Sequence, residues 1–296
     1  MAVSGEFAEW AAELTMRSVP QSVRRAACRR ILEAIAAGVG AARIGTVDPA
    51  VHVAVGIGGP PEAELIGHAA GRISAPAAAM ANGMLMDALA PEADLVTSTL
   101  AVVLPAAFAV GQEVKARGDE VLLAVVAGHE LACRLGARSS PYATGVFGAA
   151  LAAARLMALD PARIRDAVGI AGEFTGGRSS VGGTPGLSAG LAAANGIVAA
   201  RLAASGATGP DAGIDELCRA WELAPDRLVG GLGVVWASEG TWAARSTDHQ
   251  LDLEACEKLG GSRQDARALI AEVRAFAFAP SLDAILALTV KVAAGT

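Results

Sequence analysis

One short segment, NGMLMDALAPEADLVTSTLAVVLPAA, crowds acids and hydroxyls between two apolar runs. These residues are, in chain order, Asp87, Glu92, Asp94, Thr97, Ser98 and Thr99. A carboxyl group that is removed from water has a raised pKa and can act as a general acid or base. Pro91 fits a helix that stops at Ala90, which leaves Asp87 in the helix and the other two acids in a loop. Asp87 is therefore the first candidate for proton transfer.

A second segment, FTGGRSSVGGTPGLSAG, surrounds Arg178 with glycine and serine pairs. Such a loop between two helices can form a lid or an anion-binding nest, and a plain connection is an equally good interpretation. GIGGPP lacks the third glycine and the helix start of a pyrophosphate loop, so it predicts no nucleotide site.

Metal and triad chemistry find little support in the sequence. The four histidines show no HExxH or other ligand spacing, the four cysteines no CxxC spacing, and no serine lies in GxSxG. We therefore expect free buried thiols, no metal and no cofactor.

Composition narrows the class of protein and its partners. A net charge of -6, without basic clusters interleaved with aromatics, predicts no nucleic-acid partner. The start of the chain has no signal region, and Pro, Gly or charge breaks every long apolar run. We expect a soluble, cytoplasmic protein without membrane spans.

Most of the residues that mark the start or end of an element are typical of helices. Hydrophobic residues are 53% of the chain and aromatics only 4%, which predicts close packing of Ala-rich helices. Helix caps are expected at Asp119 and Asp160, and a helix end at Gly206. The expected helices are 22–40, 77–89, 120–136, 162–174, 187–206, 266–279 and 281–295. Alternation in VHVAVG predicts a strand over 51–56 that pairs with a weaker strand over 63–67.

Several runs in this order resemble the MmgE/PrpD family, which includes dehydratases and decarboxylases of polycarboxylates. The matching runs are ILEAIAAGVGAA, AAMANGMLMDALA, VVLPAAFAVG, AGHELACRLGA, GVFGAALAAARLMALDPARIRDAVGIAGEFTGG and LSAGLAAANGIVAARLAASGATGP. The resemblance implies an all-α, MmgE/PrpD-like helical domain over 1–245, with at most a small β-hairpin. It also implies that 246–296 is a linker and a truncated, vestigial helical remnant of the family's second domain, and that the chain forms a homodimer.

The same resemblance shows that the family's catalytic positions have changed. Asp87 and Ser188 stand at family histidines, Pro185 at a lysine, and Ser98-Thr99 at a His-Pro pair. A shortened loop, SSPYATG, brings in Tyr142, the only tyrosine. The catalytic residues implied for this chain are Asp87, Glu92, Asp94, Tyr142 and Glu173. The substrate-binding residues implied are Met84, Ser98, Thr144, Phe174, Arg178 and Ser188.

Three hypotheses for function follow from these changes. Polycarboxylate chemistry needs cations and a positioned acid or base, and none of the three lysines lies in a segment that matches a family site. We favour a repurposed enzyme of specialised metabolism that cyclises or isomerises an apolar small molecule. The alternatives are a lyase of the family type with substitute acids and bases, and a non-catalytic binding or partner protein.

Overall fold

The computed structural model describes residues 3–89, 95–136, 140–175, 184–210, 213–242 and 262–294. The regular structure of this part of the chain is helical apart from one two-stranded sheet, so the all-α fold class is confirmed. The elements are α1 (Val3–Glu13), α2 (Gln21–Ile44), α3 (Asp48–Ile57), β1 (Ala63–Glu64), β2 (Arg72–Ile73), α4 (Ala75–Asp87), α5 (Leu95–Glu113), α6 (Gly118–Leu135), α7 (Pro141–Leu156), α8 (Pro161–Ala171), η1 (Gly172–Phe174), α9 (Leu187–Ala204), α10 (Gly213–Ala220), α11 (Pro225–Val229), α12 (Ala237–Trp242), α14 (Arg263–Arg274), η2 (Phe276–Phe278) and α15 (Asp283–Ala294).

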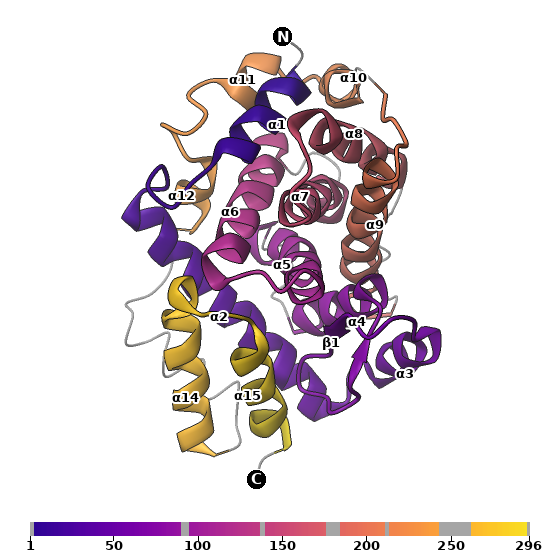
Figure 1. The fold of residues 1–296 in the computed structure, drawn as a ribbon, viewed down its shortest axis with the longest axis vertical. Helices are drawn as coiled ribbons and strands as arrows, with labels where there is room; N and C mark the ends of the chain where they lie inside the picture. Colours follow the sequence, from indigo (N-terminus) through magenta and orange to yellow (C-terminus); the bar gives the residue numbers. More distant parts are fainter. Residues whose placement is uncertain are drawn as a thin grey trace.

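Helix α7 lies at the centre of the bundle, between α5, α6, α8 and α9 (Figure 1). Glycines let these helices approach closely. A Cβ atom built on Gly128 of α6 would lie 2.3 Å from the carbonyl oxygen of Gly148 of α7, and one on Gly148 would lie 2.4 Å from that of Gly128. The two backbones are therefore in direct contact where α6 crosses α7, and no side chain fits between them.

Helix α2 confirms the helical spacing seen in the sequence. Val23, Ala27, Ile31 and Ile35 are all buried, each at most 1% exposed. The predicted cap of α8 is also confirmed, because the Asp160 carboxylate accepts a hydrogen bond from the backbone N–H of Arg163. These signals depend only on local residues, which is why the sequence predicts them well.

Two local predictions were wrong. Residues 51–56 belong to α3, a helix that starts at Asp48-Pro49 and buries Ala50 and Ala54, four residues apart. Its start signal overrides the β-branched alternation, because proline favours the first helical turn. β1 pairs instead with β2, through Ala63 opposite Ile73.

The second error concerns α6. This helix begins at Gly118, one residue before the predicted cap at Asp119. The carboxylate of Glu120 accepts a hydrogen bond from the backbone N–H of Arg117, so the capping contact comes from the third residue of the helix.

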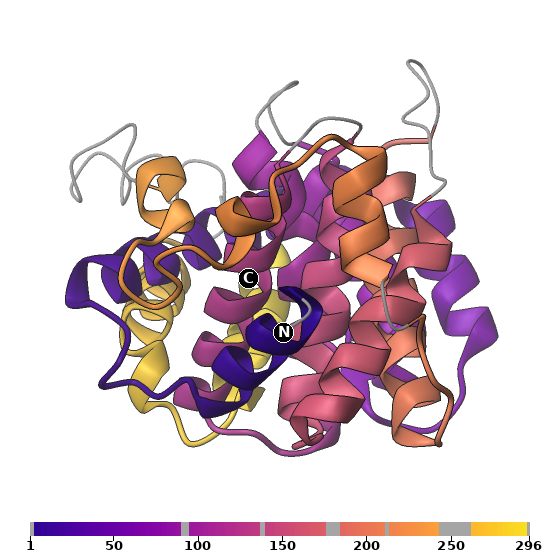
Figure 2. The same ribbon diagram turned by 90° about the horizontal axis from the view of Figure 1, so that it is seen from above.

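The later segments pack around this bundle. α10, α11 and α12 cross α1, α6 and α8 on one face, and α14 and α15 pack side by side against α2 (Figures 1 and 2). A buried ion pair fixes the segment around α12: Arg134 Nε lies 2.7 Å from Glu130 Oε1, and the Glu130 carboxylate accepts hydrogen bonds from Ala237 and Ser238. The proposed domain boundary at 245 lies outside the described residues.

Among the described residues, one helix, α9, is long and apolar enough to cross a membrane. Half of it is buried inside the domain, where it packs against α4, α7 and α8. Core helices of globular domains have the same length and composition, so this is weak evidence for a membrane span.

Candidate functional site

Three helices bring Asp87, Ser98 and Tyr142 together. Asp87 is the last residue of α4, Ser98 lies near the start of α5, and Tyr142 lies in the first turn of α7. The Tyr142 hydroxyl donates a 2.9 Å hydrogen bond to Asp87 Oδ2. Residues 55 positions apart in sequence therefore form one polar cluster in a largely apolar bundle.

Burial controls the protonation of this cluster. Removal from water raises the pKa of the Asp87 carboxyl, and hydrogen bonds from Tyr142 and Ser98 offset part of that rise. Burial also raises the pKa of Tyr142 to about 12, with a further contribution from the neighbouring Asp87 charge. Tyr142 is therefore a neutral hydrogen-bond donor near pH 7, and Asp87 holds a proton more readily than an exposed aspartate.

The second oxygen of the Asp87 carboxyl is available for chemistry. Oδ1 is buried and has no hydrogen-bond partner among the described residues, whereas Oδ2 is held by Tyr142. Buried polar atoms are normally paired, because an unpaired one costs about 1–3 kcal/mol. An unpaired carboxyl oxygen beside a neutral phenol is a suitable place for a substrate group.

A glycine contact at the end of α4 and a serine cap at the start of α7 help to position the cluster, and neither was among the predicted site features. Gly186, just before α9, has φ +69°, and a Cβ atom there would lie 2.5 Å from the carbonyl oxygen of Met84. Only glycine fits this contact, which presses α9 onto the last turn of α4. At the start of α7, the Ser140 hydroxyl accepts a hydrogen bond from the backbone N–H of Tyr142. The signals were present in the sequence as Pro185-Gly186 and Ser140-Pro141.

The other predicted site residues have varied surroundings. Met84 is 2% exposed and packs in the core, and Thr144 is fully buried, with its hydroxyl donating to the Pro141 carbonyl of its own helix. Ser188 is half-buried in the first turn of α9.

Glu173 and Phe174 form part of the short helix η1. Glu173 is exposed, so it is not a buried acid of the predicted kind, and Phe174 packs against the core. Glu92, Asp94 and Arg178 lie outside the described residues. The structure thus brings together Asp87, Tyr142 and Ser98 from the predicted set.

The described residues offer little support for a metal site or for thiol chemistry. They contain no group of three or more His, Cys, Asp or Glu side chains that could hold a metal ion. Cys28, Cys133 and Cys218 are not in disulfide bonds, and Cys256 lies outside the described residues. A groove of about 910 Å³ is present, but none of the predicted site residues lines it.

Comparison with known proteins gives the same scaffold. The MmgE/PrpD N-terminal domain matches residues 5–217. Cis-aconitate decarboxylase from Aspergillus terreus, and the protein of that name from strain NIH 2624 / FGSC A1156, are each 28% identical to this chain over 69% of its length. The match covers 46% of each relative, so the chain spans about half the length of the curated relatives it matches. The chain belongs to the MmgE/PrpD family.

Proposed function

We propose that this chain is a lyase-type enzyme in which Asp87 transfers a proton during the elimination of water or carbon dioxide from a small organic acid. The observation that carries the proposal is the buried Oδ1 of Asp87, which has no partner among the described residues; the carboxyl has a raised pKa and is held on its other oxygen by Tyr142. The similarity to a decarboxylase supports the class of reaction.

The proposed step follows from this geometry. In a decarboxylation the C–C bond breaks, carbon dioxide leaves, and its bonding electrons remain on the neighbouring carbon, to which Asp87 delivers its proton. In a dehydration the same proton goes to the departing hydroxyl group, and a base removes the proton from the adjacent carbon. Tyr142 stays protonated, keeps the carboxyl oriented and donates to Oδ2 when Asp87 becomes an anion.

Access to the acid is part of the proposal. Oδ1 is buried, so a substrate reaches it only when a neighbouring part of the chain moves. Exclusion of water after closure would keep the pKa of Asp87 raised during the reaction.

A second candidate function is the cyclisation or isomerisation of an apolar small molecule. The observation that supports this second candidate is that burial and two hydroxyl groups set the pKa of Asp87. No arginine or lysine of the described residues contributes to that pKa. A site without cations suits an uncharged substrate, and a single acid is sufficient to move a double bond or start ring closure.

The mass of the product separates the two reactions. The purified chain is incubated with cis-aconitate, with 2-methylcitrate and with uncharged unsaturated compounds of similar size, and the products are followed by mass spectrometry. Loss of carbon dioxide or water supports the lyase, and products of unchanged mass support the second candidate. No turnover of any compound would count against both.

Variants then test the role of Asp87. Asp87→Asn should lower kcat at least about a hundredfold, within the usual range for loss of a general acid or base. Asp166→Asn, which removes another buried acid of the same fold, should leave kcat within about twofold. Full turnover by Asp87→Asn would refute the proposed step. The homodimer, the cytoplasmic location and the domain boundary remain predictions.

A further inference from the structure

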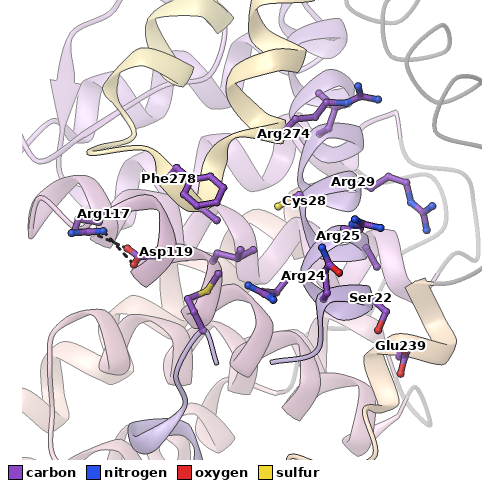
Figure 3. Close-up of a pocket in the computed structure, with 16 residues that line it drawn as sticks. Ser22, Arg24, Arg25, Cys28, Arg29, Arg117, Asp119, Glu239, Arg274 and Phe278 are labelled. Carbon is purple, nitrogen blue, oxygen red and sulfur yellow. Dashed lines mark hydrogen bonds and ion pairs between the residues drawn. The ribbon is translucent and has the colours of Figure 1, made fainter. Parts of the chain in front are cut away.

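A groove of about 910 Å³ runs along the first half of α2 (Figure 3). Its other walls come from the start of α6, from α12, and from the end of α14 with η2. Cavities of about 300–1,000 Å³ are typical of small-molecule sites. The groove is therefore large enough for an organic ligand.

Positive charge is concentrated in this groove, although the chain as a whole has a net charge of -6. Five arginines and two acids line it, and one of the acids, Asp119, already lies 3.2 Å from Arg117 Nε. Arg24, Arg25 and Arg29 project from α2, the helix that forms one wall of the groove (Figure 3). Several guanidinium groups that share one cavity attract anions, because each offers a fork of donors to carboxylate or phosphate oxygens.

Arg24 has donor capacity that the described residues do not use. Its Nε is buried and has no hydrogen-bond partner among them. Burial raises the pKa of the neighbouring Cys28 thiol to about 11, and the cationic Arg24 offsets only part of that rise. Cys28 is therefore a protonated, unreactive part of the wall, and the groove is suited to reversible binding.

An exposed aromatic ring lines the same groove. Phe278 is 88% exposed and lines the groove together with Ala277, Leu32 and Leu122. An aromatic face next to guanidinium groups can stack on a flat ring while the charges hold anionic groups. A ligand that is only a small inorganic anion would leave this apolar wall unused.

The groove is separate from Asp87. Gly38 of α2 lies against Met86, since a Cβ there would be 3.5 Å from Met86 Cγ, and Arg25 lies 13 residues earlier on the same helix. At about 1.5 Å per residue, Arg24 and Arg25 lie roughly 20 Å along α2 from this contact with α4. What binds in the groove is thus independent of the reaction proposed at Asp87.

We propose that this groove binds an organic anion that carries two or more negative charges and a flat apolar part, the chemical class to which nucleoside diphosphates belong. Arg24 and Arg25 hold the charged groups, and Phe278 packs against the flat part. The ligand is held by charge and stacking, without a covalent bond.

The test is isothermal titration of the full chain with ADP, pyrophosphate and phenylsuccinate, in buffer free of divalent cations. ADP should bind saturably, more tightly than pyrophosphate, and more weakly as salt is added. Tighter binding of phenylsuccinate than of ADP would also support the site, and would assign its natural anion as a carboxylate. No saturable binding of any probe at millimolar concentration would overturn the proposal.

Point variants locate the binding. Arg24→Gln and Arg25→Gln should each weaken binding of the tighter organic probe about tenfold, as expected for loss of a charge-assisted hydrogen bond. Arg25 is exposed, so its replacement should leave the melting temperature unchanged. Arg267→Gln, which removes an exposed arginine of α14 outside the groove, is the matched control and should have no effect.

Phe278→Ala tests whether the ligand has a flat apolar part that packs against this ring. This change should weaken ADP binding several-fold and leave pyrophosphate binding unchanged. Equal affinity for ADP and pyrophosphate, with no effect of Phe278→Ala, would overturn the assignment of a flat apolar group. Equal affinity of Arg25→Gln and Arg267→Gln would show that the anion binds elsewhere and overturn the proposal.

Discussion

The crossing of α6 and α7 gives the sharpest test of how this fold is built. Gly148→Ala would place a methyl group 2.4 Å from the carbonyl oxygen of Gly128 and 2.8 Å from Val103 Cγ2. Carbon and oxygen atoms in contact are normally at least about 3.3 Å apart. The helices must therefore separate by about 1 Å, or the methyl group must be accommodated by distortion of both backbones.

The expected loss follows from two opposing effects. Overpacking of a closely packed core costs about 1–3 kcal/mol or more, and replacing glycine by alanine inside a helix returns up to about 1 kcal/mol. We expect Gly148→Ala to lower the free energy of unfolding by about 2 kcal/mol. For a domain of this size that corresponds to a melting temperature about 4–8 °C lower. Displacement of α7 would also lengthen the 2.9 Å hydrogen bond from Tyr142 to Asp87.

The assay is thermal and urea unfolding of three proteins side by side. Gly56→Ala is the matched control, because a Cβ there has nothing within 4 Å and the residue is exposed on α3. The control should be as stable as the unchanged chain or up to about 1 kcal/mol more stable. If Gly148→Ala is as stable as Gly56→Ala, the contact between the two backbones is not what holds α6 against α7.

Three further predictions concern charge. Because the folded pKa of Asp87 is raised, the unfolded chain loses this proton first as pH rises, so the stability of the chain relative to Asp87→Asn should fall as pH rises from 4 in urea unfolding. A difference that stays constant with pH would contradict the raised pKa. Glu130→Ala removes the carboxylate partner of Arg134, whose side chain is 4% exposed, and should cost about 3–5 kcal/mol. Asp119→Ala, at an exposed pair, should cost less than about 1 kcal/mol, and equal losses in urea unfolding would show that burial of the ion pair is unimportant. With a pKa of about 11, the Cys28 thiol should react with iodoacetamide at pH 8 about a hundredfold more slowly than an unperturbed thiol. Rapid alkylation of Cys28, followed by mass spectrometry, would show that this thiol is not desolvated.

Local signals predicted much of the fold. The spacing of Val23, Ala27 and Ile31 predicted α2, and Asp160 with Pro161 predicted the start of α8, because caps and helical periodicity involve residues within a turn or two of each other. Residues 51–56 were mispredicted for a related reason: two local signals disagreed, and the helix start at Asp48-Pro49 prevailed.

The sites depend on contacts that no local pattern specifies. Asp87 and Tyr142 were both candidates, but their hydrogen bond requires α4 and α7 to meet end to end. The arginines of RRAACRR are visible in the sequence, yet their role in a groove depends on α6 and α14, which lie far along the chain. Packing between distant helices is set by side-chain and glycine contacts across the bundle, so it could be seen only in the folded chain.

The structure separates the acid from the positive charge, and this limits the substrate at Asp87. Among the groups that the structure describes, burial and two hydroxyls set the pKa of that carboxyl. Arg24 and Arg25 of the groove lie roughly 20 Å along α2 from the contact between Gly38 and Met86 of α4. A polycarboxylate at Asp87 would need cations from residues outside the described ranges, and Arg178 is the one predicted from the sequence. Arg178→Gln should then abolish turnover of carboxylate substrates and spare that of uncharged ones. Equal turnover of a tricarboxylate by Arg178→Gln and the unchanged chain would show that Arg178 does not hold the carboxylates.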